Sequence, residues 1–222
     1  MSLKDIKLKI KSIDRTRKVT KAMESVSAVK MRKSQLRAIT GRPYASAALS
    51  ILERMSVSLN SLKHPLTSVR PVKSAAIAVV TSDKGLCGVF NSAVVKEENK
   101  LAESLSLPRE AVSIYAFGRK GAEFFERRRY KVVEKFENVS DDVSVADLLR
   151  VSNDIARAFG NKEFDRVDVV YTNFNSTFEQ SALSHTVLPL SLDAISAMVD
   201  GIIPEKGKFA VKQRTKGPSF YT

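Results

Sequence analysis

Residues that build covalent cross-links and metal sites are scarce in this chain. Among its 222 residues there is one cysteine, Cys87, and there are two histidines, His64 and His185. A single cysteine excludes an internal disulfide, which suits a protein of a reducing compartment. Three such side chains, far apart in the sequence, do not make up the four ligands of a typical structural zinc site. We therefore expect neither a metal centre nor a disulfide framework.

Long apolar runs are also missing. The chain has no stretch of 18 apolar residues, so no membrane-spanning helix is expected. Residues 1–15 contain no apolar core of the secretory type, and Asp5 and Asp14 lie among the bases there, unlike in a transit peptide. Apolar residues still make up 43% of the chain, which is typical of a folded domain rather than a disordered one.

The motifs of several common catalytic and nucleotide-binding sites are absent too. The chain contains no GxxxxGK[ST], GxGxxG, GxSxG or HExxH sequence. The strongest remaining candidate is the loop 82–88, whose glycines we interpret as permitting a tight turn, with phosphate binding as the alternative. Cys87 in this loop would be a nucleophile only beside a base, and neither histidine stands in a motif that supplies one. We expect no catalytic residue and no cofactor.

Two clusters of like charge are each open to two interpretations. Arg127–Arg129 would contact phosphate or complement the dipole at the end of a helix. Asp141–Asp142 would hold a metal ion or, more commonly for such a pair, cap the helix that follows. Neither cluster identifies a site by itself.

Positive charge is concentrated at the N-terminus. Residues 1–45 hold 13 Lys and Arg against 3 Asp and Glu, a net charge of +10, whereas the whole chain carries +13. The rest of the chain is therefore nearly neutral. A basic element attached to a nearly neutral body indicates that the element lies against something acidic. The plainer explanation is a solvated helix face.

The same segment has the pattern of a long helix with a narrow apolar face. Four residues share the 3-4-3 spacing of a coiled-coil seam: Leu3, Ile6, Ile10 and Ile13. Helix-favouring residues dominate, so we predict a helix from about residue 3 to about residue 60 and treat residues 1–62 as one domain. Such a seam needs another helix to bury it. Packing on the chain's own body and self-association are the alternatives.

From about residue 72 the pattern changes to short apolar runs that alternate with helical stretches. Strands are predicted at 74–81, 113–117, 131–136 and 166–172, with a weaker one within 178–190. Helices are predicted at 91–105, 119–128, 144–159 (capped by Ser144) and 193–199. This alternation predicts a mainly parallel sheet in an α/β layer fold over residues 72–192. Residues 193–222 would begin a further, incomplete C-terminal segment.

Two long segments resemble the gamma subunit of F-type ATP synthases. The first comprises Leu3–Ile6, Ile10–Ile13 and Lys18–Met23, with Arg42–Tyr44 following at the interval usual in that family. The second is Thr81–Asn91, which reads TSDKGLCGVFN. The resemblance runs from Met1 to about Thr222, and two long motifs at the correct separation are hard to obtain by chance.

This resemblance implies a fold and a role. In the family, a basic N-terminal helix pairs with a long C-terminal helix as a coiled-coil shaft inside a ring of alternating alpha and beta subunits. A Rossmann-like body lies near the epsilon subunit and the c-ring of the membrane rotor. The shaft transmits torque during proton-coupled ATP synthesis or hydrolysis and holds no catalytic residue. The resemblance thus implies these four kinds of partner. Because the start of the chain is unlike a transit peptide, we expect a place at the cytoplasmic face of a bacterial plasma membrane rather than in a mitochondrial matrix.

The resemblance also implies residue roles. Lys18, Lys21 and Met23 are expected to face the ring, where the beta subunits present acidic loops. The seam of Leu3, Ile6, Ile10 and Ile13 is expected to face the partner helix. The signature loop is expected beside the shaft near the lower rim of the ring. It consists of Ser82, Asp83, Lys84, Gly85, Leu86, Cys87 and Gly88.

The chain departs from the family at one point, and its sequence also suits two other functions. The family's long C-terminal helix has no counterpart here, so we expect a chain that is shortened relative to the family. A basic helix on a globular body also suits nucleic acid, although no aromatic residue precedes Tyr44 and no binding module is recognisable. A small α/β enzyme could use Gly85–Gly88 for a phosphorylated ligand. We favour the gamma-subunit interpretation and expect no nucleic-acid partner.

Overall fold

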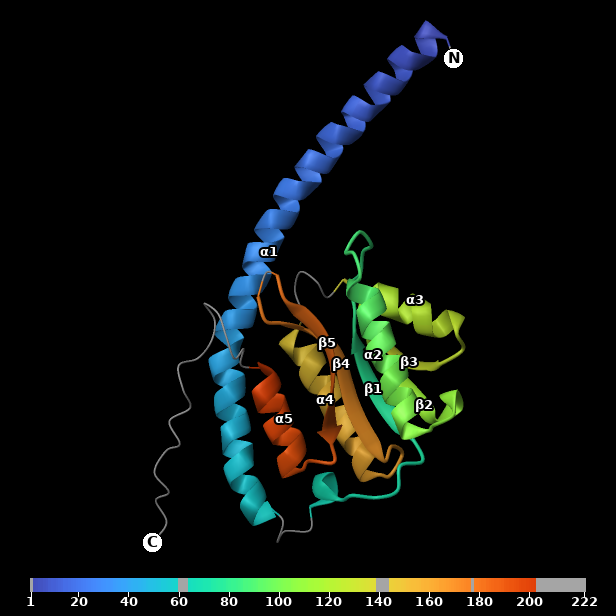
Figure 1. Ribbon diagram of the computed structural model, residues 1–222. Coiled ribbons are helices and arrows are strands. Elements are labelled where there is room, and N and C mark those ends of the chain that lie inside the picture. The colour runs from blue at the N-terminus through green and yellow to red at the C-terminus, as the bar shows by residue number, and fades with distance from the viewer. Residues whose placement is uncertain (1, 60–63, 139–143, 177, 203–222) are drawn as a thin grey trace. The chain divides into compact units, whose positions relative to one another are not determined.

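The computed structural model describes residues 2–59, 64–138, 144–176 and 178–202. By internal contacts the chain divides into two compact units, Met1–Tyr44 and Ala45–Thr222. Figure 1 labels the helices and strands of both. Two short 3-10 helices, η1 (Pro65–Thr67) and η2 (Arg109–Ala111), complete the regular structure of the described part.

Helix α1 (Leu3–Leu59) is continuous over 57 residues, which confirms the predicted long helix. It starts with a reciprocal cap, in which the Ser2 N–H donates to the Asp5 carboxylate at 3.0 Å and the Asp5 N–H donates to Ser2 Oγ at 3.4 Å. Such a cap satisfies N–H groups that a helix start leaves without partners. The helix continues through Gly41 and Pro43.

The second unit is built on a five-stranded sheet with the order β3-β2-β1-β4-β5. The parallel strands are β1 (Ala75–Val80), β2 (Val112–Phe117), β3 (Lys131–Phe136) and β4 (Arg166–Phe174). Strand β5 (Gln180–Leu188) runs antiparallel to β4. The predicted mainly parallel sheet is confirmed. The exception at β5 has a simple cause, because the short connection from β4 leaves no room for the crossover that a parallel strand requires.

Helices cover both faces of this sheet (Figure 1). Helices α2 (Phe90–Leu105) and α3 (Arg119–Arg127) pack on one face, and α4 (Val145–Gly160) packs on the other. Helix α5 (Leu192–Ile202) lies against β5. Ser144 caps α4 as predicted, since its Oγ accepts a hydrogen bond from the Asp147 N–H at 3.4 Å.

Strand β1 lies at the centre of the core. Ile77 packs with Phe125 of α3 on one face of the sheet, while Ala76 packs with Phe159 of α4 on the other. All four residues are fully buried. Burial on both faces explains the nearly continuous apolar run in the sequence, because a strand covered on one face only would alternate with polar residues.

No helix in the described ranges combines the length and the apolar character that a membrane crossing needs.

Candidate functional site

The apolar side chains of the first unit are exposed along α1. Leu3, Ile6, Ile10 and Ile13, the residues of the predicted seam, have between 41% and 72% of their surface exposed. A second group, Val19, Met23, Val26 and Val29, is exposed to a similar degree. Exposed apolar groups on this scale mark an interaction surface, because covering each one stabilises an assembly by about 25 cal/mol per Å².

The charged side chains of this helix form only local ion pairs. The Asp14 carboxylate lies 2.9 Å from both Lys18 Nζ and Arg17 Nη2, and these hydrogen bonds from Lys18 and Arg17 lower the Asp14 pKa. The Lys18 charge is therefore partly offset on the helix surface, whereas Lys21 has no ion-pair partner among the described residues. Met23 is half exposed. The assignment of Lys18, Lys21 and Met23 to a ring interface stays a prediction.

The loop between β1 and α2 is anchored by a buried carboxylate. Asp83 is only 5% exposed, and its Oδ1 accepts hydrogen bonds from the Arg119 N–H at 3.1 Å and the Asn138 N–H at 2.9 Å. These donors lie at the start of α3 and just after β3. One side chain thus connects the segments that follow three neighbouring strands.

A second set of hydrogen bonds fastens this loop to the first turn of α2. Asn91 Oδ1 accepts from the Ser82 N–H at 3.0 Å. Asn91 Nδ2 donates to Ser82 Oγ at 2.8 Å and to Cys87 Sγ at 3.1 Å. The loop residues are thereby held by the helix that they introduce.

Thr81, Gly118 and Gly121 form a close backbone contact that sequence reasoning missed. Thr81 Oγ1 donates to the Phe117 or Gly118 carbonyl and accepts from the Gly121 N–H at 2.8 Å. A Cβ at Gly118 would lie 2.2 Å from the Thr81 carbonyl oxygen, and one at Gly121 would lie 2.7 Å from Thr81 Oγ1. Glycine is therefore required at both positions. The two glycines of the GRKG sequence were the signal that could have revealed this contact.

The far end of the same loop is exposed to solvent. Lys84 and Gly85 are exposed, Leu86 is 96% exposed and has a φ of +62°, and Gly88 has a φ of +58°. A leucine in the left-handed region is uncommon. The loop is therefore anchored by hydrogen bonds at Ser82 and Asp83 and presents the apolar side chain of Leu86 at its exposed end.

This geometry favours a structural turn over an active site. The buried Asp83 carboxylate is a poor neighbour for a phosphate because like charges repel. The partners of the Cys87 thiol are the Ser82 hydroxyl, the Lys84 carbonyl and the Asn91 amide, none of which acts as a general base. No cluster of three or more potential metal ligands occurs in the described ranges. Asp141–Asp142 lie outside the described residues.

Comparison with known proteins decides the family. A family model described as ATP synthase matches residues 2–216. The ATP synthase gamma chain of Cupriavidus metallidurans (strain CH34) is 38% identical over 197 residues, which cover 89% of this chain and 68% of that protein. The chain belongs to the ATP synthase gamma chain family. The chloroplastic gamma chain of Pisum sativum is 36% identical over 192 residues, which cover 85% of this chain and 51% of that protein.

Gamma-chain membership agrees with the fold. The chain resembles a chain in the cryo-EM structure of the Tetrahymena thermophila mitochondrial ATP synthase central stalk and c-ring, with a TM-score of 0.62 and 24% identity. That match covers 85% of this chain and 79% of the other. The present gamma-family chain spans about half to two thirds of the length of the curated relatives that it matches.

One further titratable residue was missed by sequence reasoning. Glu98 of α2 is fully buried, and neither of its carboxylate oxygens has a hydrogen-bond partner among the described residues. Burial raises the pKa of Glu98 to about 7 against the opposing charge of Arg109. Its position, between the buried Val94 and Leu101 at helical spacing, was the signal that could have revealed it.

Proposed function

We propose that this chain is a central-stalk gamma subunit that transmits torque between a membrane rotor and an alpha/beta catalytic ring, without catalysing a reaction itself. The observation that carries the proposal is the 57-residue helix with exposed apolar side chains. Family membership supports it. Residues 1–62 would supply one half of the shaft, residues 72–192 the Rossmann-like body, and residues 193–222 the beginning of the segment that follows.

A shaft needs more than one helix. The exposed seam of Leu3, Ile6, Ile10 and Ile13 is suited to an antiparallel partner helix, which would bury the apolar side chains and stiffen the rod. Torque passes along a rod only if the rod resists bending and twisting. Covering the seam therefore serves transmission as well as stability.

The cationic surface of the shaft suits a contact that has to be broken and formed again. Lys18 and Lys21 are exposed, and Met23 is half exposed. An exposed ion pair contributes only about 0–1 kcal/mol, because water and salt screen it. Such contacts with acidic loops of the beta subunits would guide the shaft in the ring and still let it turn.

The signature loop and the body supply the remaining contacts of the proposal. The base at Ser82 and Asp83 is held by hydrogen bonds, and the exposed Leu86 tip is available to the lower rim of the ring. The body would dock on the epsilon subunit and the c-ring. The chain would then reside at a membrane through its partners, on the cytoplasmic face of a bacterial plasma membrane.

Rotation in a reconstituted complex tests this function. The full chain would be mixed with purified alpha and beta subunits and a separate polypeptide carrying the C-terminal helix of a gamma relative. A bead would be attached to a cysteine replacing the exposed Glu103, with Cys87→Ser as background. ATP should drive rotation in one direction. Failure of all components to assemble, or assembly with ATP hydrolysis that never turns the bead, would overturn the proposal.

Matched variants separate the two proposed surfaces of the shaft. Ile6→Asp with Ile10→Asp should prevent pairing with the partner helix and so prevent assembly. Lys18→Gln with Lys21→Gln should permit assembly but lower the rotation torque. Lys9→Gln with Lys11→Gln removes the same charge elsewhere on α1 and should have a smaller effect. Equal loss of torque in both lysine pairs would contradict the assigned ring-facing positions.

A further inference from the structure

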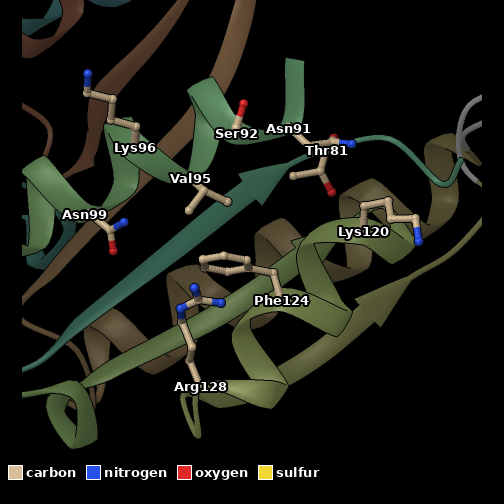
Figure 2. A pocket seen from close by; sticks show the side chains of 9 residues that line it. All are labelled: Thr81, Asn91, Ser92, Val95, Lys96, Asn99, Lys120, Phe124 and Arg128. Carbon is tan, nitrogen blue, oxygen red and sulfur yellow. The ribbon is translucent and has the colours of Figure 1, made fainter. Parts of the chain in front are cut away.

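An open groove lies between α2 and α3, on the face of the sheet that these helices cover. Figure 2 shows its lining, and its volume is about 430 Å³. Val95 and Phe124 provide apolar surface in the groove, and Asn99 contributes an amide. Three cationic side chains line it as well: Lys96, Lys120 and Arg128.

The positive charge around this groove is largely uncompensated. Lys120 shares its charge with Glu123, 3.0 Å away. By contrast, neither Lys96 nor Arg128 forms an ion pair with a carboxylate within the described parts of the chain. Outside residues 1–45 the chain is nearly neutral, so this is a local excess of positive charge.

One of these cations is held in place by an aromatic ring. The Arg128 guanidinium carbon lies 3.6 Å from the centre of the Phe124 ring. Stacking restricts the side chain and leaves the edge of the planar guanidinium free to donate to an acceptor. A carboxylate is the acceptor that this edge matches best, through two parallel N–H···O bonds.

The cations do not converge on one point. In Figure 2 the ammonium groups of Lys96 and Lys120 and the guanidinium of Arg128 lie at separate places around the groove. A single phosphate group would reach only one of them. An anionic membrane would present a flat surface and leave the recessed Val95 and Phe124 unfilled. A polypeptide segment with several carboxylates and an apolar side chain between them could contact the separated cations and also cover Val95 and Phe124.

We propose that the α2–α3 groove docks an acidic polypeptide segment of a partner protein. An aliphatic side chain of that segment packs on Val95 and Phe124, and flanking carboxylates pair with Lys96 and Arg128. The rotary role does not enter this inference, since no residue of α1 is part of the groove.

Binding of a defined peptide tests the proposal. The probe is a fluorescent peptide of alternating Glu and Leu, about 12 residues long, that carries a photoreactive group. Its binding to the full chain would be followed by anisotropy. Lys96→Gln with Arg128→Gln should weaken binding about tenfold or more. Lys18→Gln with Lys21→Gln removes the same charge from α1 and should change binding less than about twofold. Both double variants should melt like the parent chain.

Further variants, a control peptide and crosslinking identify what the groove recognises. Arg128→Lys keeps the charge but loses the planar stack, and should weaken binding by about threefold. A peptide with Gln in place of Glu should not bind. Photo-crosslinks should fall in residues 91–99 and 119–128. Crosslinks on α1, equal losses in the two double variants, or binding of phosphatidylglycerol vesicles or inorganic pyrophosphate in place of the peptide would overturn the proposal.

Discussion

The two units of the chain use the same kinds of apolar residue in opposite ways. Ile10 and Ile13 in the first unit are each more than half exposed, whereas Ile77 and Ile114 in the second are fully buried. In the body, burial of such side chains supplies the stability. In the first unit such side chains are exposed, so the apolar surface of the helix is available to another molecule.

Charged groups show the same contrast. On α1 the Asp14 carboxylate is paired with neighbours three and four residues away on an exposed helix face. In the body the Asp83 carboxylate is buried and bonds to backbone groups 36 and 55 residues away. Exposed local pairs are weak, whereas a buried carboxylate with two charge-assisted hydrogen bonds is costly to disturb.

Replacing a glycine should change the unfolding free energy of the two units by the most different amounts. Gly118→Ala forces a Cβ to 2.2 Å from the Thr81 carbonyl oxygen at a φ of +103°, so the body should lose more than about 4 kcal/mol of unfolding free energy. Gly41→Ala meets no atom within 4 Å and should stabilise α1 by up to about 1 kcal/mol. Urea unfolding measured by tyrosine fluorescence and circular dichroism checks both. Similar changes in unfolding free energy at Gly118 and Gly41 would contradict the difference in packing between the two units.

The buried Glu98 should make the stability of the body depend on pH. Its pKa is raised to about 7 in the folded state, so between the ordinary value of 4.5 and about 7 the folded protein holds a proton that the unfolded chain has lost. Unfolding free energy should therefore fall by about 3 kcal/mol as pH rises through this range and level off above it. Glu98→Gln should remove this slope in urea titrations from pH 5 to 8.5. The exposed Glu24→Gln on α1 serves as control and should keep it.

Neutralising an aspartate should distinguish a buried anchor from an exposed pair. Asp83→Asn weakens both hydrogen bonds to backbone N–H groups and should cost the body about 2 kcal/mol of unfolding free energy. Asp14→Asn should leave the melting of the isolated chain unchanged within error. Thermal melts followed by circular dichroism compare the two. A larger loss from Asp14→Asn would show that the helix relies on that pair.

Removing one methyl group from an isoleucine should give the smallest difference in unfolding free energy between the two units. Ile77→Val creates a small cavity in a fully buried site and should cost about 1 kcal/mol of unfolding free energy. Ile10→Val changes an exposed position and should have almost no effect on the isolated chain. Chemical denaturation of both variants measures this. Ile10→Val should matter only once a partner helix covers the seam, and a large effect without one would mean that Ile10 is already buried.

Elements with a strong local pattern were predictable from the sequence. The apolar run of β1, the Ser144 cap and the long helix α1 all appear close to where their residue patterns place them. Strand β5 was predicted only weakly, because most of its residues are partly exposed and give no clean alternation. Its antiparallel direction depends on the short connection from β4.

The candidate sites also fall into those that a local sequence pattern predicts and those that depend on distant parts of the chain. The seam of Leu3, Ile6, Ile10 and Ile13 was predicted from spacing alone. Its side chains are exposed in the described chain, and its role as a coiled-coil seam stays a prediction. The roles of Asp83 and Thr81 could not be predicted, because their partners lie in other βα segments. The α2–α3 groove was equally hidden, since Lys96 and Arg128 come to line one groove only after both helices pack on the sheet.

The order of residues was therefore sufficient for the long helix and for the succession of strands and helices, because each depends on neighbours within one or two turns. Folding in three dimensions was needed to join Asp83 to residues 36 and 55 positions away and to form the groove. Those features depend on long loops closing around a common core, and no local spacing encodes which side chains will then meet.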